Sequence, residues 1–150
     1  MANSTVKIVG LKQFNRKVQD LSDKELQAML TKCAIIVEED AKDFCPSSGY
    51  NYPGLGGSSL KESITHEVEG NTAAIGTNKE YAPYVLQGTG IYAVNGDGLK
   101  TPWTYYDERT QQFYTTIGQL PNPFLTAALQ NQQNEIIKIV NDAVKDHLDD

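Results

Sequence analysis

The fold of this chain is decided by the stretch that begins Leu21-Ser22-Asp23-Lys24-Glu25-Leu26 and ends at Pro46. Ser22 and Glu25 have the spacing of a capping box, and Leu21 and Leu26 have that of the hydrophobic staple that often accompanies it. Apolar residues then recur at helical spacing along one face: Leu26, Met29, Leu30, Cys33, Val37, Ala41 and Phe44. Because Pro46 cannot continue a helix, the pattern predicts an amphipathic helix of about 22 residues, roughly 33 Å long, that stops soon after Phe44.

On the N-terminal side of this stretch, a second helical pattern predicts a short first helix through Leu11, Phe14, Val18 and Leu21. On its C-terminal side the period changes to the alternation of a strand. The segments Ser63 to Val68 and Ala73 to Thr77 flank a Gly70-Asn71 turn, which predicts an antiparallel hairpin.

A second hairpin is predicted further along the chain. The segments Trp103 to Tyr106 and Gln112 to Ile117 are rich in aromatic and β-branched residues, and they flank the polar residues 107–110. The cluster Asn95-Gly96-Asp97-Gly98 before them is a turn. Tyr81 to Gln87 fits either a strand or a short helix, since a proline at its third position removes a ladder donor but is tolerated in a first helical turn.

A last helix opens with Asn122 as its cap and Pro123 at its first position. Its apolar stripe runs through Leu125, Ala128, Leu129, Ile136, Val140, Ala143, Val144 and His147. The segment Gln130 to Asn134 is wholly polar, so the helix there either crosses solvent or meets a polar neighbour. We therefore expect one α+β domain over residues 1–150, with two long amphipathic helices packed on a small antiparallel β-sheet and with long loops.

Composition excludes several classes of function. The net charge of -6 and the pI near 4.9 disfavour a protein that holds nucleic acid by neutralising phosphates. The longest apolar run, Cys33 to Val37, is far shorter than a membrane-spanning helix, so we expect no membrane partner. The first residues carry no apolar stretch after a basic region, which predicts synthesis and assembly in a cytoplasm.

Candidate catalytic and metal sites are weak. Ser58 with Lys61 fits a Ser-x-x-Lys pattern, in which a lysine activates a serine, but the companion motifs of such enzymes are missing. A Cys-His hydrolase would need Cys33 or Cys45 beside a histidine, and a helix C-terminus is the wrong place for a reactive thiol. The scattered cysteines and histidines predict no metal or cofactor site. We expect no catalytic residues and no enzyme activity.

Four motifs carry a family resemblance, and they occur in this order: Ser58-Ser59-Leu60-Lys61-Glu62-Ser63-Ile64, Ile75-Gly76-Thr77, Tyr81 to Gly90, and Pro123-Phe124-Leu125. In order and spacing the chain resembles, over most of its length, the neck and tail-completion (head-tail joining) proteins of long-tailed bacteriophages. The residues that match the motifs are Leu60, Ser63, Ile64, Tyr81, Tyr84, Gly88, Thr89, Pro123 and Phe124. We expect them mainly to set the fold, with Tyr81, Tyr84 and Phe124 in or near the core.

The resemblance implies a structural virion protein of the neck region, in which a homo-oligomeric and commonly hexameric ring joins the DNA-filled head to the tail. Its neighbours would be a head-side connector and tail proteins, and DNA would pass through the channel without specific binding. An acidic lumen would repel that DNA. Alternatives are a tail terminator that caps the tail tube and a small cytoplasmic hydrolase that uses Ser58 or Cys45.

Contacts with subunits or partners are expected on the loop 46–62 and on the hairpin region 91–118, because loops rich in aromatic rings favour interfaces. The candidate contact residues are Tyr50, Tyr52, Tyr92, Trp103, Tyr105 and Tyr106. The chain departs from the family in two places. Leu86 stands where an acidic residue is common, and the stretch Ser47 to Ser59 is expected to form an enlarged loop.

Overall fold

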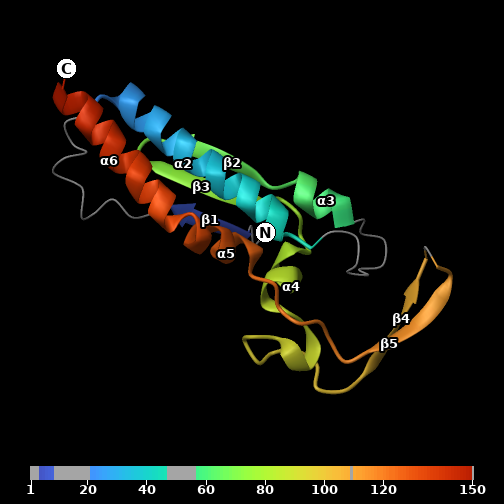
Figure 1. Cartoon of the computed structure of the whole chain (residues 1–150). Coiled ribbons are helices and arrows are strands. Elements are labelled where there is room, and N and C mark those ends of the chain that lie inside the picture. The colour runs from blue at the N-terminus through green and yellow to red at the C-terminus, as the bar shows by residue number, and fades with distance from the viewer. Residues whose placement is uncertain (1–3, 9–20, 47–56, 109, 150) are drawn as a thin grey trace.

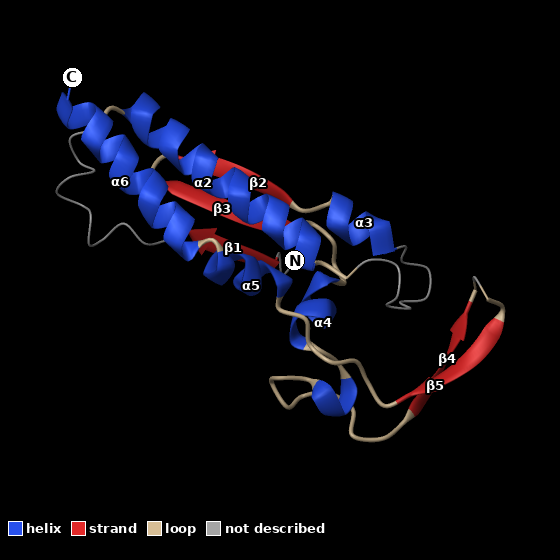
Figure 2. Ribbon diagram, in the orientation of Figure 1, coloured by secondary structure: helices blue, strands red, loops and turns tan. Residues whose placement is uncertain are grey.

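The computed structural model describes residues 4–8, 21–46, 57–108 and 110–149, and they form an α+β fold (Figures 1 and 2). In chain order the elements are β1 (Ser4–Ile8), α2 (Asp23–Phe44), α3 (Gly57–Glu62), β2 (Thr65–Glu69), β3 (Thr72–Thr77), α4 (Ala82–Gln87), the 3₁₀ turn η2 (Gly90–Tyr92), β4 (Trp103–Asp107), β5 (Gln112–Thr116), α5 (Phe124–Asn131) and α6 (Gln133–Asp149). The predicted first helix and most of the predicted 47–59 loop lie outside the described residues. Gly57–Glu62, expected within the contact loop 46–62, is instead helical.

The elements β1, β2 and β3 form an antiparallel sheet in the order β1-β3-β2, and α2 lies across it (Figure 1). The predicted Gly70-Asn71 hairpin is confirmed, with Val68 opposite Ala73. The strand β1 was not predicted. We call this sheet with α2, α5 and α6 the body.

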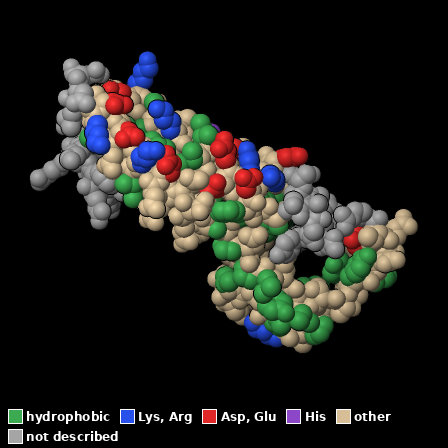
Figure 3. All heavy atoms as spheres, viewed as in Figure 1, with side chains coloured by type: hydrophobic (Ala, Val, Ile, Leu, Met, Phe, Trp, Pro, Cys, Tyr) green, Lys and Arg blue, Asp and Glu red, His purple; other side chains and the backbone are tan. Residues whose placement is uncertain are grey.

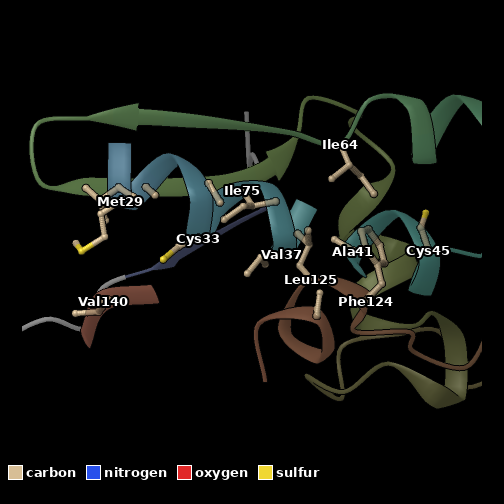
Figure 4. Close-up of a cluster of buried hydrophobic side chains, with 14 of the residues drawn as sticks. Met29, Cys33, Val37, Ala41, Cys45, Ile64, Ile75, Phe124, Leu125 and Val140 are labelled. Carbon is tan, nitrogen blue, oxygen red and sulfur yellow. The ribbon is translucent and has the colours of Figure 1, made fainter. Parts of the chain in front are cut away.

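The core of the body lies between α2, the sheet and α5 (Figure 4). Its most deeply buried side chains include Val37 of α2, Ile75 of β3 and Phe124 and Leu125 of α5. Each large apolar side chain removed from water in this way stabilises the fold by about 1.5–3 kcal/mol. The core is therefore assembled from segments far apart in the sequence.

The long helix α2 has the predicted bounds because both of its ends are specified locally. The backbone amide of Ser22 donates to the carboxylate of Glu25 at 2.8 Å, and the amide of Glu25 donates to Ser22 Oγ at 3.4 Å, which confirms the capping box. The helix also ends at Phe44 as predicted, but Phe44 does not lie on the buried face where the pattern placed it. Phe44 is 41% exposed, and Cys45, the C-cap residue, is buried in its place because the chain leaves the helical path there.

The predicted last helix is in fact two helices, α5 and α6, which break at Gln132. The side-chain amides of Asn131 and Gln132 both donate to Asp40 Oδ2 of α2, at 2.6 and 2.8 Å. The wholly polar segment therefore meets a polar neighbour, one of the two alternatives from the sequence. The start is also shifted by one residue, since Pro123 is the N-cap and Asn122 instead donates from its side chain to Phe44 O at 3.5 Å.

Residues 88–121 leave the body after α4 and return to it before α5, and we call them the arm (Figure 1). Tyr81 to Gln87 had fitted either a strand or a helix, and it forms the helix α4, with Pro83 in its first turn. The arm ends in the predicted second hairpin, in which β4 pairs antiparallel with β5. Figure 2 shows the hairpin set apart from the three-stranded sheet.

Candidate functional site

The Gly-Thr-Gly motif fixes the base of the arm. The backbone amide of Thr89 donates to Gln119 O at 2.9 Å, and that of Ile91 donates to Ile117 O at 3.0 Å. The amide of Gln119 donates in return to Thr89 Oγ1 at 3.0 Å. Gly90, between them, has φ +60°, and a Cβ atom there would lie 2.1 Å from Ile117 O. Only glycine allows the two segments at the base of the arm to approach so closely.

The hairpin carries aromatic pairs on both of its faces. Tyr105 of β4 stacks on Tyr114 of β5 with ring centroids 5.9 Å apart. The next pair, Tyr106 and Phe113, is tilted, with centroids 5.0 Å apart. Successive residues of a strand point to opposite faces, so these two pairs lie on opposite sides of the hairpin. Both are directly opposite in the strand register.

Most of the exposed large apolar side chains of the described residues lie in the arm: Ile91, Tyr92, Val94, Leu99, Tyr106, Phe113, Tyr114, Ile117 and Leu120. We call this set the apolar arm surface. The most exposed of these is Phe113, at 73%. Figure 3 shows the contrast between the arm, where hydrophobic side chains gather, and the body, which is studded with acidic and basic groups. Exposed apolar area of this kind is typical of contact sites.

Charge is correspondingly scarce in the arm. Its charged residues are Asp97, Lys100, Asp107, Glu108 and Arg109, so the acidic and basic groups nearly cancel. Of these, Asp107 is buried at the end of β4, and its carboxylate accepts a hydrogen bond from the amide of Thr110 at 3.4 Å. Most of the chain's net charge of -6 therefore resides outside the arm.

Those predicted contact residues that the structure describes all lie in the arm. Tyr92 and Tyr106 are exposed, and Trp103 and Tyr105 are half-buried. Tyr50 and Tyr52 lie outside the described residues. The sequence had indicated the hairpin region as a whole, but it did not single out Phe113, Leu99 or Leu120. The signal that could have found Phe113 is its position opposite Tyr106 in the predicted hairpin.

The motif residues of the family resemblance are divided between core and surface. Leu60, Ile64 and Phe124 are buried, and Gly88 is buried at the start of the arm. Tyr81 is half-buried against the core, and Pro123 is exposed. Tyr84 was expected in or near the core but is 57% exposed, because its side of α4 faces away from the body's buried cluster.

A small charged cluster lies on the body where β2 meets α2. His66 Nδ1 and Lys42 Nζ each hydrogen-bond a carboxylate oxygen of Glu38. Burial raises the pKa of Glu38, but the hydrogen bonds from Lys42 and His66 outweigh it, so that the pKa lies below its usual value of 4.5. Glu38 therefore stays a carboxylate and holds His66 in place.

The cluster borders a groove of about 570 Å³ along β2 and β3, which is lined by His66 and also by Ser63. A histidine held by a carboxylate can activate a serine that hydrogen-bonds it. Ser63 Oγ, however, donates to Leu60 O at 2.7 Å and lies 2.5 Å from Thr77 Oγ1. Within the described residues no hydrogen bond joins Ser63 to His66, so Ser63 is tied into the structure instead.

The cysteines are poorly suited to nucleophilic chemistry. Cys33 and Cys45 are free and buried, and burial raises the pKa of both thiols to about 11. A thiol of that pKa is almost entirely protonated near neutrality, whereas the thiolate is the nucleophile. The side chain of Ser58, the other candidate of the hydrolase alternative, lies outside the described part of the chain.

The described residues contain no cluster of His, Cys, Asp and Glu that could hold a metal ion, and no helix long and apolar enough to span a bilayer. Comparison with protein families, curated proteins and solved structures finds no match to this chain. The phage-neck resemblance thus stays a prediction from the motifs, and the apolar arm surface is the strongest candidate site.

Proposed function

We propose that this protein is a structural subunit of the neck of a long-tailed bacteriophage, where copies of it form a ring that joins the head to the tail. The observation that carries the proposal is the apolar arm surface, with Phe113 as its most exposed member. A large apolar surface on an extension of the body is typical of a subunit that is completed by its neighbours. The order of the four sequence motifs supports the same assignment.

In this proposal the body and the arm have different roles. The body contributes one sector of the ring wall, and its acidic character lets DNA pass without being trapped. The arm makes the contacts with neighbouring copies and with the adjacent head-side connector and tail proteins. A hexameric ring is what the family resemblance implies, and the virion neck is the location that follows.

The proposal is tested by electron microscopy of the protein mixed with purified tail-less heads and, separately, with head-less tails of the phage that encodes it. Ring density at the portal vertex supports the joining role, and density only at the end of the tail tube supports the tail-terminator alternative. If density is found at neither site, and the variants Phe113→Asp and Ile35→Asp impair phage complementation to the same extent, both the joining role and the tail-terminator role are overturned.

Two matched variants connect the test to the arm. Phe113→Asp places a charge on the apolar arm surface, whereas Ile35→Asp places one on α2 of the body, at a side chain that is 41% exposed. We expect Phe113→Asp to abolish ring density and phage assembly, and Ile35→Asp to leave both near the wild-type level. Equal effects of the two variants would contradict a specific role of the arm.

A further inference from the structure

Among the described residues, the outermost strands of the two sheets differ in how their sequences oppose further pairing. The edge strand β1 contains Lys7, and the other edge strand, β2, contains Glu67 and Glu69. Charged residues on an edge strand discourage further strands from adding to it. The strand β5, Gln-Phe-Tyr-Thr-Thr, contains no charged residue and no proline. Its sequence therefore offers none of the usual obstacles to an added strand.

The hairpin is also incomplete as a sheet. Its two strands pair only with one another, and within the described residues no third strand joins either edge. Four of the five residues of β5 are exposed. A two-stranded hairpin is at best marginally stable in water, and every second residue of β5 directs its backbone amide and carbonyl away from β4. No strand of the described residues takes up these groups.

We infer that β5 of one copy pairs with β4 of a second copy of this chain, so that neighbouring hairpins continue a single antiparallel sheet. The pairing between copies can use the same register as the pairing within one hairpin, with Thr104 opposite Thr115 and Tyr106 opposite Phe113. Because each copy offers both a β5 edge and a β4 edge, the contact is head-to-tail, and such contacts can close into a ring.

The distribution of charge favours a second copy as the occupant. Two acidic bodies repel one another, but the arm carries few charges and they nearly cancel. The arm also offers apolar area for such a contact. With roughly 200 Å² for a large apolar residue, its exposed fractions sum to about 900 Å² per copy over both faces of the hairpin and the rest of the arm. A standard interface buries about 800 Å² on each partner, and the β5–β4 contact would use a part of this surface.

This inference deepens the proposed function, since the paired hairpins would be what closes the ring. The strand pairing and the joining role can be refuted separately, because self-association of the purified protein is measured without heads or tails. Rings that bind neither heads nor tails would support the strand pairing and refute the joining role. A protein that stays monomeric and still docks on heads would refute the strand pairing and support the joining role.

Disulfide trapping tests which strands meet. Thr104→Cys on β4 and Thr115→Cys on β5 are made as separate single variants, so that neither chain can bridge its own hairpin. Directly opposite residues of an antiparallel pair lie about 4.5–5.5 Å apart at Cα, within reach of a disulfide. We expect oxidised dimers in the mixture of the two variants and none in either alone. Phe113→Cys, two positions earlier on the same face, is included to detect a shifted register.

The wild-type protein is the background control, because its two native cysteines are buried. Dimers in the Thr115→Cys sample alone would indicate a symmetric β5–β5 contact and overturn the head-to-tail pairing. No cross-link in any mixture, with a monomer at every concentration in sedimentation velocity, would overturn the inference altogether.

A charge placed on the edge provides an independent test. We expect Thr115→Lys to raise the dissociation constant of self-association by at least about tenfold, since a lysine on an edge strand opposes strand addition. Ile35→Lys on the body is the matched control and should leave the constant unchanged. Amide hydrogen exchange in β5 should slow on self-association in the wild type and in Ile35→Lys, but not in Thr115→Lys. Equal behaviour of the two variants would contradict the pairing.

Discussion

Replacing Gly90 by alanine should detach the base of the arm without unfolding the body. The new Cβ atom would lie 2.1 Å from Ile117 O, and because that atom belongs to the backbone, the two segments must separate. The left-handed conformation costs an alanine about 1–2 kcal/mol. Separation also breaks the hydrogen bonds between Thr89 or Ile91 and the opposite segment, at about 1 kcal/mol each. The local loss is therefore about 3–4 kcal/mol.

Gly96→Ala is the matched control, since Gly96 also has a positive φ, +70°, but a Cβ atom there would meet nothing within 4 Å. It should lose only the conformational part, about 1–2 kcal/mol. Hydrogen exchange at the amides of Thr89, Ile91 and Gln119 measures the difference. We expect exchange on the order of 100- to 1,000-fold faster in Gly90→Ala than in wild type, with α2 unchanged. If the two variants exchange alike, the close approach is not what holds the arm.

Three further outcomes are expected in the body. Asp40→Ala removes the acceptor shared by the two side-chain amides at the bend between α5 and α6, so urea unfolding should show a loss of about 1–3 kcal/mol, against little change for the adjacent exposed Glu39→Ala. The pKa of Glu38 lies below its usual value of 4.5, so the stability that Glu38 contributes is present above pH 4.5 and is lost as the pH falls through the lowered pKa. The variant Glu38→Gln should therefore flatten this part of the profile of unfolding free energy against pH. An unchanged profile would contradict the role of Glu38. Burial raises the pKa of Cys45 to about 11, so alkylation at pH 8 should be slow in the folded protein and fast in urea, and rapid labelling of the folded protein would refute its burial.

The parts of the fold that sequence predicts well are those specified within a few residues. The capping box places Ser22 and Glu25 only three positions apart, and the turn at Gly70-Asn71 joins two adjacent strands. Such signals need no knowledge of the rest of the chain. The position of α2 and the pairing of β2 with β3 could therefore be predicted directly.

The errors come from contacts between distant residues. The break between α5 and α6 depends on Asp40, which accepts from Gln132 across 92 positions. The strand β1 was missed because it has five residues and is defined by pairing with β3, with Val6 opposite Ile75. A polar segment or a short alternating one does not reveal its partner, so neither feature could be read locally.

The candidate site was predicted in the same partial way. Aromatic residues around a turn indicated the hairpin and its use as a contact, but they did not decide which rings would be exposed. An aromatic residue in a strand is as compatible with a core as with a surface. The exposure of Phe113 and the half-burial of Tyr105 follow from the hairpin standing away from the body, which is a property of the whole fold. The glycine requirement at Gly90 likewise follows only from the nearness of Ile117.

The separation of the hairpin from the body carries the strongest physical argument for a partner. Within the described residues, neither β4 nor β5 makes an extensive contact with a helix of the body. Two five-residue strands alone are marginal in water, and here both of their faces carry aromatic pairs. The hydrogen bonds around Gly90 hold only the base of the arm. The described residues therefore leave the hairpin with little support of its own, and in the proposed pairing a neighbouring hairpin would add a strand and matching rings.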